Sequence, residues 1–359
     1  MRVLDRYILR ELALPLIFCS VALIFFFLIA DLFNHLDGII SNQTSLGDLL
    51  LYYLNLVPFA FTQTISWATL FAATFLFVRF NTQNEFIAMK ASGLHITQIV
   101  FPIVFMGFIL GVLTFSVGDQ LMPSTFLRAE QIRKEKIEGK LDVTSAIENV
   151  TLLDGNVRYY ARKLDLKTST LSDIVIHIDS PESIMTVRAP KARWTGSKWR
   201  FYNVSTFETD MKGNSLGQHK NYPAKVFREI NASPGRLEES TRDIELLNLK
   251  EIQHHISQLK DNNIKTLEEE VEFARKLAFP WHSLIVLIIL APFLIRTYNR
   301  RQMATTVLIC LGLVIGFHII GLFSLALGRI GVLPTLLSAW LPFVLFLAFS
   351  ILIFEYGNQ

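Results

Sequence analysis

The sequence predicts an α-helical polytopic membrane protein with six transmembrane helices and an inserted β-jelly-roll domain outside the cytoplasm. The chain of 359 residues is 51% hydrophobic and contains 29 Phe, which is too apolar for one soluble domain. Long apolar runs lie on both sides of a polar segment that begins near Ser124 and ends near Ala274. Lys and Arg are concentrated in alternate loops, which indicates the side of the membrane on which each loop lies.

Six apolar runs are long enough to cross a hydrocarbon core of roughly 30 Å at about 1.5 Å per residue. The first run follows Arg2, Arg6 and Arg10, and a cleaved signal peptide is the alternative interpretation of that segment. Pro15 lies early in it and five further runs follow, which favours a retained span. In chain order the runs are Leu14–Ala30, Leu50–Val78, Ile99–Met122, Leu277–Ile295, Ala304–Leu327 and Leu336–Phe354.

The short loops predict the orientation of these spans. The N-terminus, the loop from Arg79 to Thr97 and the loop from Arg296 to Gln302 carry Arg or Lys and alternate onto one side. The loop from Ala30 to Leu49 has three Asp and no Lys or Arg. Because cytoplasmic loops are enriched in Lys and Arg, both termini are expected in the cytoplasm and the polar domain on the opposite side.

The polar insert has the pattern of a β domain, and the regular spacing of its strands favours a sandwich or a jelly roll. Short runs rich in Val, Ile and Tyr are separated by Asp154-Gly155 and by Thr195-Gly196-Ser197, which favour tight turns. Helical patterns flank these strands and continue the third and fourth spans. We therefore divide the chain into residues 1–123 with three spans, residues 124–274 with the β-jelly-roll domain and its helical stalks, and residues 275–359 with three more spans. Cys19 and Cys310 both fall in apolar runs, so the domain must fold without disulfides.

The cytoplasmic loop at residues 84–93 predicts a short amphipathic helix that ends at Gly93. It could lie on the membrane surface, or it could dock into a groove on a cytoplasmic partner with Glu85 as a charged anchor. Docking residues expected in that second case are Glu85, Phe86, Met89, Lys90 and Gly93.

Several motifs together resemble one membrane-protein family. They are Leu4-Asp5-Arg6-Tyr7-Ile8, Glu85-x-x-Ala88-Met89-x-Ala91-Ser92-Gly93, Leu249-Lys250-Glu251-Ile252 and Lys276-Leu277-Ala278-Phe279-Pro280. In order and spacing they resemble the lipopolysaccharide export permeases LptF and LptG. The resemblance covers the whole chain, and the N-terminal motif is closer to the LptG branch.

The resemblance implies one subunit of an ABC transporter that extracts lipopolysaccharide from the bacterial inner membrane for export to the outer membrane. It implies a sibling permease subunit, a separate ABC ATPase dimer that binds the coupling helix, a single-span periplasmic LptC-like protein and a periplasmic bridge protein. The polar insert would then be periplasmic and would pass the lipid to that bridge. The first and fifth spans would line a lipid cavity.

Residues expected at that cavity are Phe25, Phe26, Phe27, Asp31, Phe317 and His318. For any single Phe, ordinary core or lipid-facing packing is an open alternative. His318 lies inside a span, where ionisable side chains often face a cavity, although a hydrogen bond to a neighbouring helix would also explain it. Asp31 is unusual because the family often carries Lys or Arg there, and Asp31→Lys is expected to preserve or improve transport.

The sequence contains no G-x-x-x-x-G-K-[ST] phosphate loop, so ATP hydrolysis by that route must come from another chain and we predict a non-catalytic subunit. No metal or other cofactor site and no nucleic-acid partner is predicted. The adjacent His254 and His255 point in different directions on a helix. Alternative functions are a mechanotransmission ABC permease that moves no substrate through the membrane, or an envelope assembly factor with an extracytoplasmic β domain.

Overall fold

The computed structural model describes residues 3–139, 146–180, 183–210, 220–239, 244–261, 266–294 and 300–356. Two compact units emerge from its contacts. The membrane unit contains Met1–Ala129, Asn248–Gln253 and Leu267–Gln359, and the second unit contains Glu130–Leu247 and His254–Thr266. We describe each unit separately.

Six helical segments of the described chain are long and apolar enough to cross a membrane, as the sequence predicted. The first two are α1 (Val3–Asn34) and α3 (Leu46–Thr82), with the short α2 (Leu36–Ser41) between them. The third comprises α5 (Ile96–Ser116), a π-helical turn at Val117–Leu121, α6 (Met122–Ile132) and a second π-helical turn at Arg133–Ile137. The fourth comprises α9 (Leu267–Ala278), a 3-10 turn at Phe279–Trp281 and α10 (His282–Leu294). The last two are α11 (Arg300–Arg329) and α12 (Thr335–Tyr356).

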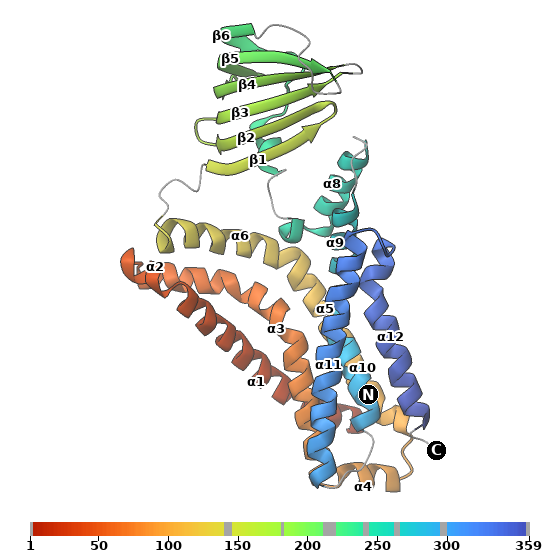
Figure 1. Ribbon diagram of the computed structural model, residues 1–359. Helices are drawn as coiled ribbons and strands as arrows, with labels where there is room; N and C mark the ends of the chain where they lie inside the picture. Colours follow the sequence, from red (N-terminus) through yellow and green to blue (C-terminus); the bar gives the residue numbers. More distant parts are fainter. Residues whose placement is uncertain are drawn as a thin grey trace. The chain divides into compact units, whose positions relative to one another are not determined.

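Helix α10 is central to the membrane unit because it contacts α3, α5, α11 and α12, while α1 packs on α3 (Figure 1). Two glycines make the contact between α5 and the fourth span possible. A Cβ atom added at Gly107 would lie 2.9 Å from the Leu284 Cα, and one added at Gly111 would lie 2.7 Å from the Trp281 ring. Both close contacts therefore require a residue without a Cβ atom. Gly312 of α11 has no such close neighbour, since no described atom of the chain lies within 4 Å of a Cβ added there.

The spans differ in how much of their apolar surface this chain covers. Only 17% of the apolar window of α1 and 22% of that of α11 are buried within the chain, against 56% for α3. Apolar side chains that stay exposed within one chain must meet lipid or another subunit. Helices α1 and α11 thus present the largest uncovered surfaces, which agrees with the interpretation of the first and fifth spans.

The inserted β domain is also confirmed, with its described strands in one antiparallel six-stranded sheet of order β1-β2-β3-β4-β5-β6. Its strands form a sequential meander, without the crossing connections that a complete jelly roll would require. Gly155 and Gly196 have positive φ values of 62° and 95° at the two predicted turns. The strands are β1 (Ala146–Asp154), β2 (Val157–Asp165), β3 (Thr170–Asp179), β4 (Ser183–Trp194), β5 (Trp199–Asp210) and β6 (Lys220–Val226).

A line of unpaired residues crosses the sheet. Between β2 and β3 the register passes from Ala161 opposite Ile174 to Lys163 opposite Ser172, so that Arg162 and Asp173 fall outside the ladder. Asp173 has a φ of 50°. In a regular strand, residues three positions apart point to opposite faces. One extra residue in the strand bends it and reverses the alternation, so Ala161 and Leu164 are both buried on the same face. That face carries the core around Trp199 and Phe201, and the opposite face stays polar.

Further helices complete the described chain, with bounds α4 (Glu85–Ala91), α7 (Pro234–Glu239), a 3-10 turn at Ile244–Leu246 and α8 (Leu249–Asp261). Helix α7 contacts β1 in the second unit, where Arg236 forms two hydrogen bonds with the Asp154 carboxylate. In the membrane unit, α8 begins with the Leu249 amide donating to the Asp119 carboxylate at 2.8 Å. The predicted loop after the fourth span lies largely at residues 295–299, outside the described residues.

Candidate functional site

The predicted cytoplasmic helix is present as α4, between α3 and α5. It lies at the same end of the membrane unit as the start of α1 and the end of α12 (Figure 1). Gly93 follows it with a φ of 79°, and its amide donates to the Lys90 carbonyl at 3.0 Å. Glycine adopts this left-handed conformation at little steric cost because it lacks a Cβ atom, which suits it to the end of a helix. The role predicted for Gly93 in ending the helix is therefore confirmed.

One face of α4 packs on the chain's own core. Phe86 is 2% exposed and Met89 is 8% exposed, and both belong to the main apolar cluster of the membrane helices. The Phe86 ring meets the Phe80 ring edge-on at 5.8 Å between centroids. The expectation that Phe86 and Met89 form the docking face needs correction, because these side chains anchor the helix to α3 and leave the opposite face uncovered.

Two polar contacts tie the same region to α1. The Tyr7 hydroxyl donates to Glu85 Oε2 at 2.8 Å, and the Tyr7 ring stacks on Phe80 at 6.2 Å. One turn further along α1, Glu11 forms an ion pair with Arg79 at the end of α3. Glu85 is thus a half-buried carboxylate with a partner inside its own chain. Of the five predicted docking residues, Lys90 and Gly93 lie on the exposed face, next to the exposed Ile87.

The aromatic residues predicted on α1 are mostly uncovered. Phe25 is 64% exposed and Phe26 is 70% exposed, whereas Phe27 is half-buried and meets the Phe59 ring of α3 at 6.0 Å. Asp31 accepts a hydrogen bond of 2.9 Å from the buried Tyr52 hydroxyl. The Asp31 carboxylate also lies 3.4 Å from His35 Nδ1. It therefore joins α1 to α3, a contact that span-by-span sequence reasoning did not reveal.

Phe317 and His318 are neighbours on α11 with different environments. Phe317 is 1% exposed and packs edge-on against Phe343 and Phe346 of α12. Its prediction as a cavity residue needs correction, since its ring is part of the helix core. His318 stacks on Trp67 of α3 at 4.6 Å and lines a cavity, as expected for an ionisable residue within a span.

This cavity has a volume of about 270 Å³. Its walls are mainly apolar, and its polar side chains are Gln63, Arg275, His282 and His318. Residues from four spans line it, namely Gln63, Arg275, Ala278, Phe279, His282, His318, Gly321, Leu322, Leu325, Ala339 and Pro342. A concave apolar site with a few polar groups is typical of small-ligand binding.

Hydrogen bonds orient both histidines of the cavity. His282 Nδ1 lies 2.6 Å from the Phe279 carbonyl, and His318 Nδ1 lies 2.9 Å from the Val314 carbonyl. Because a carbonyl only accepts, each Nδ1 must be the donor, which leaves Nε2 as an acceptor in the neutral ring. Arg275 is held by Glu272 through hydrogen bonds of 2.6 to 3.0 Å. The site can therefore accept hydrogen bonds within apolar walls. His282 and Arg275 were missed because only the tertiary fold brings them to His318.

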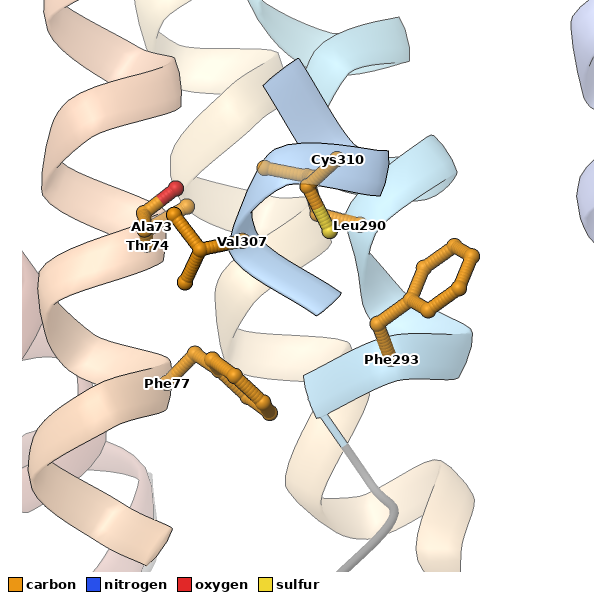
Figure 2. A pocket seen from close by; sticks show the side chains of 7 residues that line it. All are labelled: Ala73, Thr74, Phe77, Leu290, Phe293, Val307 and Cys310. Atoms are coloured by element: carbon orange, nitrogen blue, oxygen red, sulfur yellow. The ribbon is translucent and has the colours of Figure 1, made fainter. Parts of the chain in front are cut away.

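A second cavity lies between α3, α10 and α11 (Figure 2). Its volume of about 10 Å³ is close to the space that one water molecule needs. Its lining consists of Ala73, Thr74, Phe77, Leu290, Phe293, Val307 and Cys310. This space is a local packing gap and is too small for a ligand.

Within the described part of the chain, no three His, Cys, Asp or Glu side chains come together in a way that could hold a metal ion. No curated protein matches the chain. The family model described as "Lipopolysaccharide export system permease LptF/LptG" matches residues 6–356, and its full-length match agrees with six spans and an inserted β domain. The chain therefore belongs to the LptF/LptG family of lipopolysaccharide export permeases, multi-pass proteins of the inner membrane.

Proposed function

We propose that this chain is one permease subunit of an ABC transporter that extracts lipopolysaccharide from the inner membrane. A sibling permease completes the membrane pathway, and a separate ABC ATPase dimer supplies the energy. The lipid then passes through the periplasmic β domain, by way of an LptC-like protein, to a periplasmic bridge. Within the family we assign the chain to the LptG branch, on the motif from Leu4 to Ile8.

The observation that carries this proposal is the construction of α4. A seven-residue helix is far too short to be stable alone, and tertiary contacts must hold it. Phe86 and Met89 supply those contacts, and Tyr7 fixes Glu85 from α1. What remains exposed is a face with Ile87 and Lys90. We assign this face to the ATPase, because a helix held rigidly to the spans can transmit a movement of its partner to them.

The uncovered aromatic surface of α1 supports the lipid part of the proposal. Phe25 and Phe26 lie on a span that this chain covers least, and α11 is similarly uncovered. Side chains of this kind offer apolar area to acyl chains at little entropic cost. In our interpretation α1 and α11 face the space shared with the sibling subunit.

Co-purification from mild detergent tests the assignment of α4. Ile87→Asp places a charge on the exposed face and is expected to abolish retention of the ATPase, because Ile87 is 46% exposed and the fold does not depend on it. Ile330→Asp is the matched control, since Ile330 is 70% exposed in the turn between α11 and α12 and should leave retention unchanged. A wild-type complex that never contains an ATPase or a second permease would contradict the proposed function.

A further inference from the structure

Four cationic side chains lie together on the polar face of the β domain. Lys191 and Arg193 belong to β4, Arg200 belongs to β5 and Lys198 ends the turn between these strands. Arg193 is the direct cross-strand partner of Arg200. Lys191 precedes Arg193 by two residues, with the buried Ala192 between them, so both long side chains point away from the core. We call Lys191, Arg193, Lys198 and Arg200 the basic patch.

The basic patch is not neutralised by the part of the chain that the structure describes. None of its four members forms an ion pair with a described residue, whereas other arginines of the domain do. Arg158 pairs with Asp179 at 2.6 Å, and Arg162 lies 3.6 Å from Asp173. In the row that contains Arg193 and Arg200, the residues on either side are Thr170 and Val226, so no acid adjoins either arginine along the ladder.

A pair of arginines placed directly opposite each other weakens an antiparallel sheet. Cβ atoms of cross-strand partners lie about 4.5–5.5 Å apart, and like charges at that distance repel. The two neighbouring lysines add to the repulsion. Concentrated positive charge that costs stability in the isolated domain becomes favourable when an anion binds across it.

We propose that the basic patch binds phosphate groups on the sugar head of the lipopolysaccharide cargo during its passage over the β domain. This inference rests on the proposed function for the identity of the cargo. It assigns the polar face of the sheet to the charged head, separately from the aromatic surface of α1 that we assign to acyl chains.

The dimensions of the patch favour a discrete phosphate over a membrane surface. Its cations lie on two adjacent strands, within about one cross-strand spacing in one direction and about 13 Å along the strands, from Lys191 to Lys198 opposite Thr195. That footprint accommodates one or two phosphate groups. Guanidinium groups bind a phosphate through two parallel hydrogen bonds, and a phosphate monoester concentrates nearly two negative charges on one centre. A carboxylate peptide would bring only one charge per group.

Site-specific photocrosslinking in the complete transporter, reconstituted in nanodiscs, tests the proposal. Benzoylphenylalanine replaces Tyr202, an exposed aromatic residue directly opposite Lys191. After addition of ATP we expect a crosslink to lipopolysaccharide, and we expect Arg193→Gln/Arg200→Gln to reduce its yield at least fivefold. Arg162→Gln/Lys220→Gln is the control, since it removes the same charge from two exposed positions of the same sheet outside the patch.

Three results would overturn the inference. The first is an equal crosslink yield in both double variants, with amide exchange showing that strands β4 and β5 are folded in each. The second is an undiminished yield with lipopolysaccharide from which phosphatase has removed the phosphates. The third is a crosslink to phosphatidylglycerol of the nanodisc in place of lipopolysaccharide, which would indicate a membrane-docking face.

A second crosslinking position separates failure of this inference from failure of the proposed function. Benzoylphenylalanine at Phe25 probes the lipid surface of α1 in the same complex. A lipopolysaccharide crosslink at residue 25 without one at residue 202 would contradict only the phosphate-binding role of the basic patch. The absence of a lipopolysaccharide crosslink at both positions would contradict the transport function itself.

Discussion

The Tyr7 hydroxyl donates a 2.8 Å hydrogen bond to Glu85 Oε2 across 78 residues of sequence, and thereby joins α1 to helix α4. Helix α1 is also the span that this chain covers least. A displacement of α4 by a cytoplasmic partner would therefore act directly on the helix whose Phe25 and Phe26 we assign to the lipid.

Tyr7→Phe is expected to weaken ATPase binding about fivefold while leaving the fold intact. The ring keeps its stacking on Phe80, and only the hydrogen bond to the carboxylate is lost, an effect of about 1 kcal/mol for a partly exposed site. Titration of the purified permease pair with the ATPase measures the affinity. Tyr53→Phe is the control, because the buried Tyr53 hydroxyl has no hydrogen-bond partner among the described residues, and its removal should leave binding unchanged. Equal affinities in wild type and Tyr7→Phe would contradict a positioning role for Tyr7.

Truncation of the anchor of α4 should have a much larger effect than truncation of its exposed face. Phe86→Ala removes a fully packed ring and is expected to cost about 3–5 kcal/mol locally, enough to unfold a helix of seven residues. Ile87→Ala should preserve the helix. Amide exchange of residues 84–93 measures the difference. Equal protection in both variants would mean that α4 is held by something other than Phe86.

The sequence predicted the existence and end of α4 but not its facing. Gly93 ends the helix through its own backbone conformation, which depends on nearby residues, so its role could be predicted from the local sequence. The direction in which Phe86 points depends on its contact with Phe80, which lies on α3 and not in α4 itself. In a helix of seven residues, apolar side chains that face the chain's own core have the same spacing as apolar side chains that face a partner protein. The same limit applies to Phe317, whose partners lie on α12, and to His282, which meets His318 only in the folded helices.

The β domain shows the complementary case. Alternating Val, Ile and Tyr with Gly at the turns predicted strands, because that period and those turn residues act within a few positions. Strand order depends on long-range pairing, which local patterns do not encode, so the sequence indicated a jelly roll where the described strands form a meander.

Glycine substitutions on two spans should have opposite outcomes. Gly111→Ala places a methyl group 2.7 Å from the Trp281 ring and is expected to destabilise the contact between α5 and the fourth span by about 1–3 kcal/mol. Gly312→Ala meets nothing within 4 Å and should be neutral or stabilise α11 by roughly 0.5–1 kcal/mol through helix propensity. Thermal unfolding of the purified complex in detergent compares them. A lower midpoint for Gly312→Ala than for Gly111→Ala would refute this packing.

Asp31→Lys is expected to impair transport, in contrast to the expectation from sequence alone. The substitution removes the carboxylate that accepts the 2.9 Å hydrogen bond of the Tyr52 hydroxyl and puts a cation in its place, at a cost of about 1–3 kcal/mol. Asp31→Asn keeps a side-chain oxygen and should retain most transport. Lipopolysaccharide delivery from proteoliposomes measures both variants. Full activity of Asp31→Lys would show that the contact between α1 and α3 does not depend on this residue.

Protonation of His177 should make the β domain less stable as the pH falls. Burial lowers the pKa of His177 below its usual 6.5, and Arg158 and Arg188 act in the same direction while Asp179 opposes them. The unfolded chain therefore binds the proton more readily than the folded domain. The full contribution to stability is present above pH 6.5 and declines as the pH falls from 6.5 toward the folded pKa. Amide exchange of β3 and β4 at pH 7.5 and 5.5 measures the decline.

His177→Gln supplies the matched comparison, because Gln retains a polar group toward the Thr186 hydroxyl, which lies 2.9 Å from His177 Nδ1. Exchange rates of this variant should change less between the two pH values than those of the wild type, after correction for intrinsic exchange. The pKa of the Asp165 carboxyl is lowered by the Thr168 backbone amide, so Asp165 keeps its charge throughout this window and adds no decline of its own. An identical pH response in wild type and His177→Gln would assign the effect to another group, because the only titratable group that the two proteins do not share is the imidazole of residue 177.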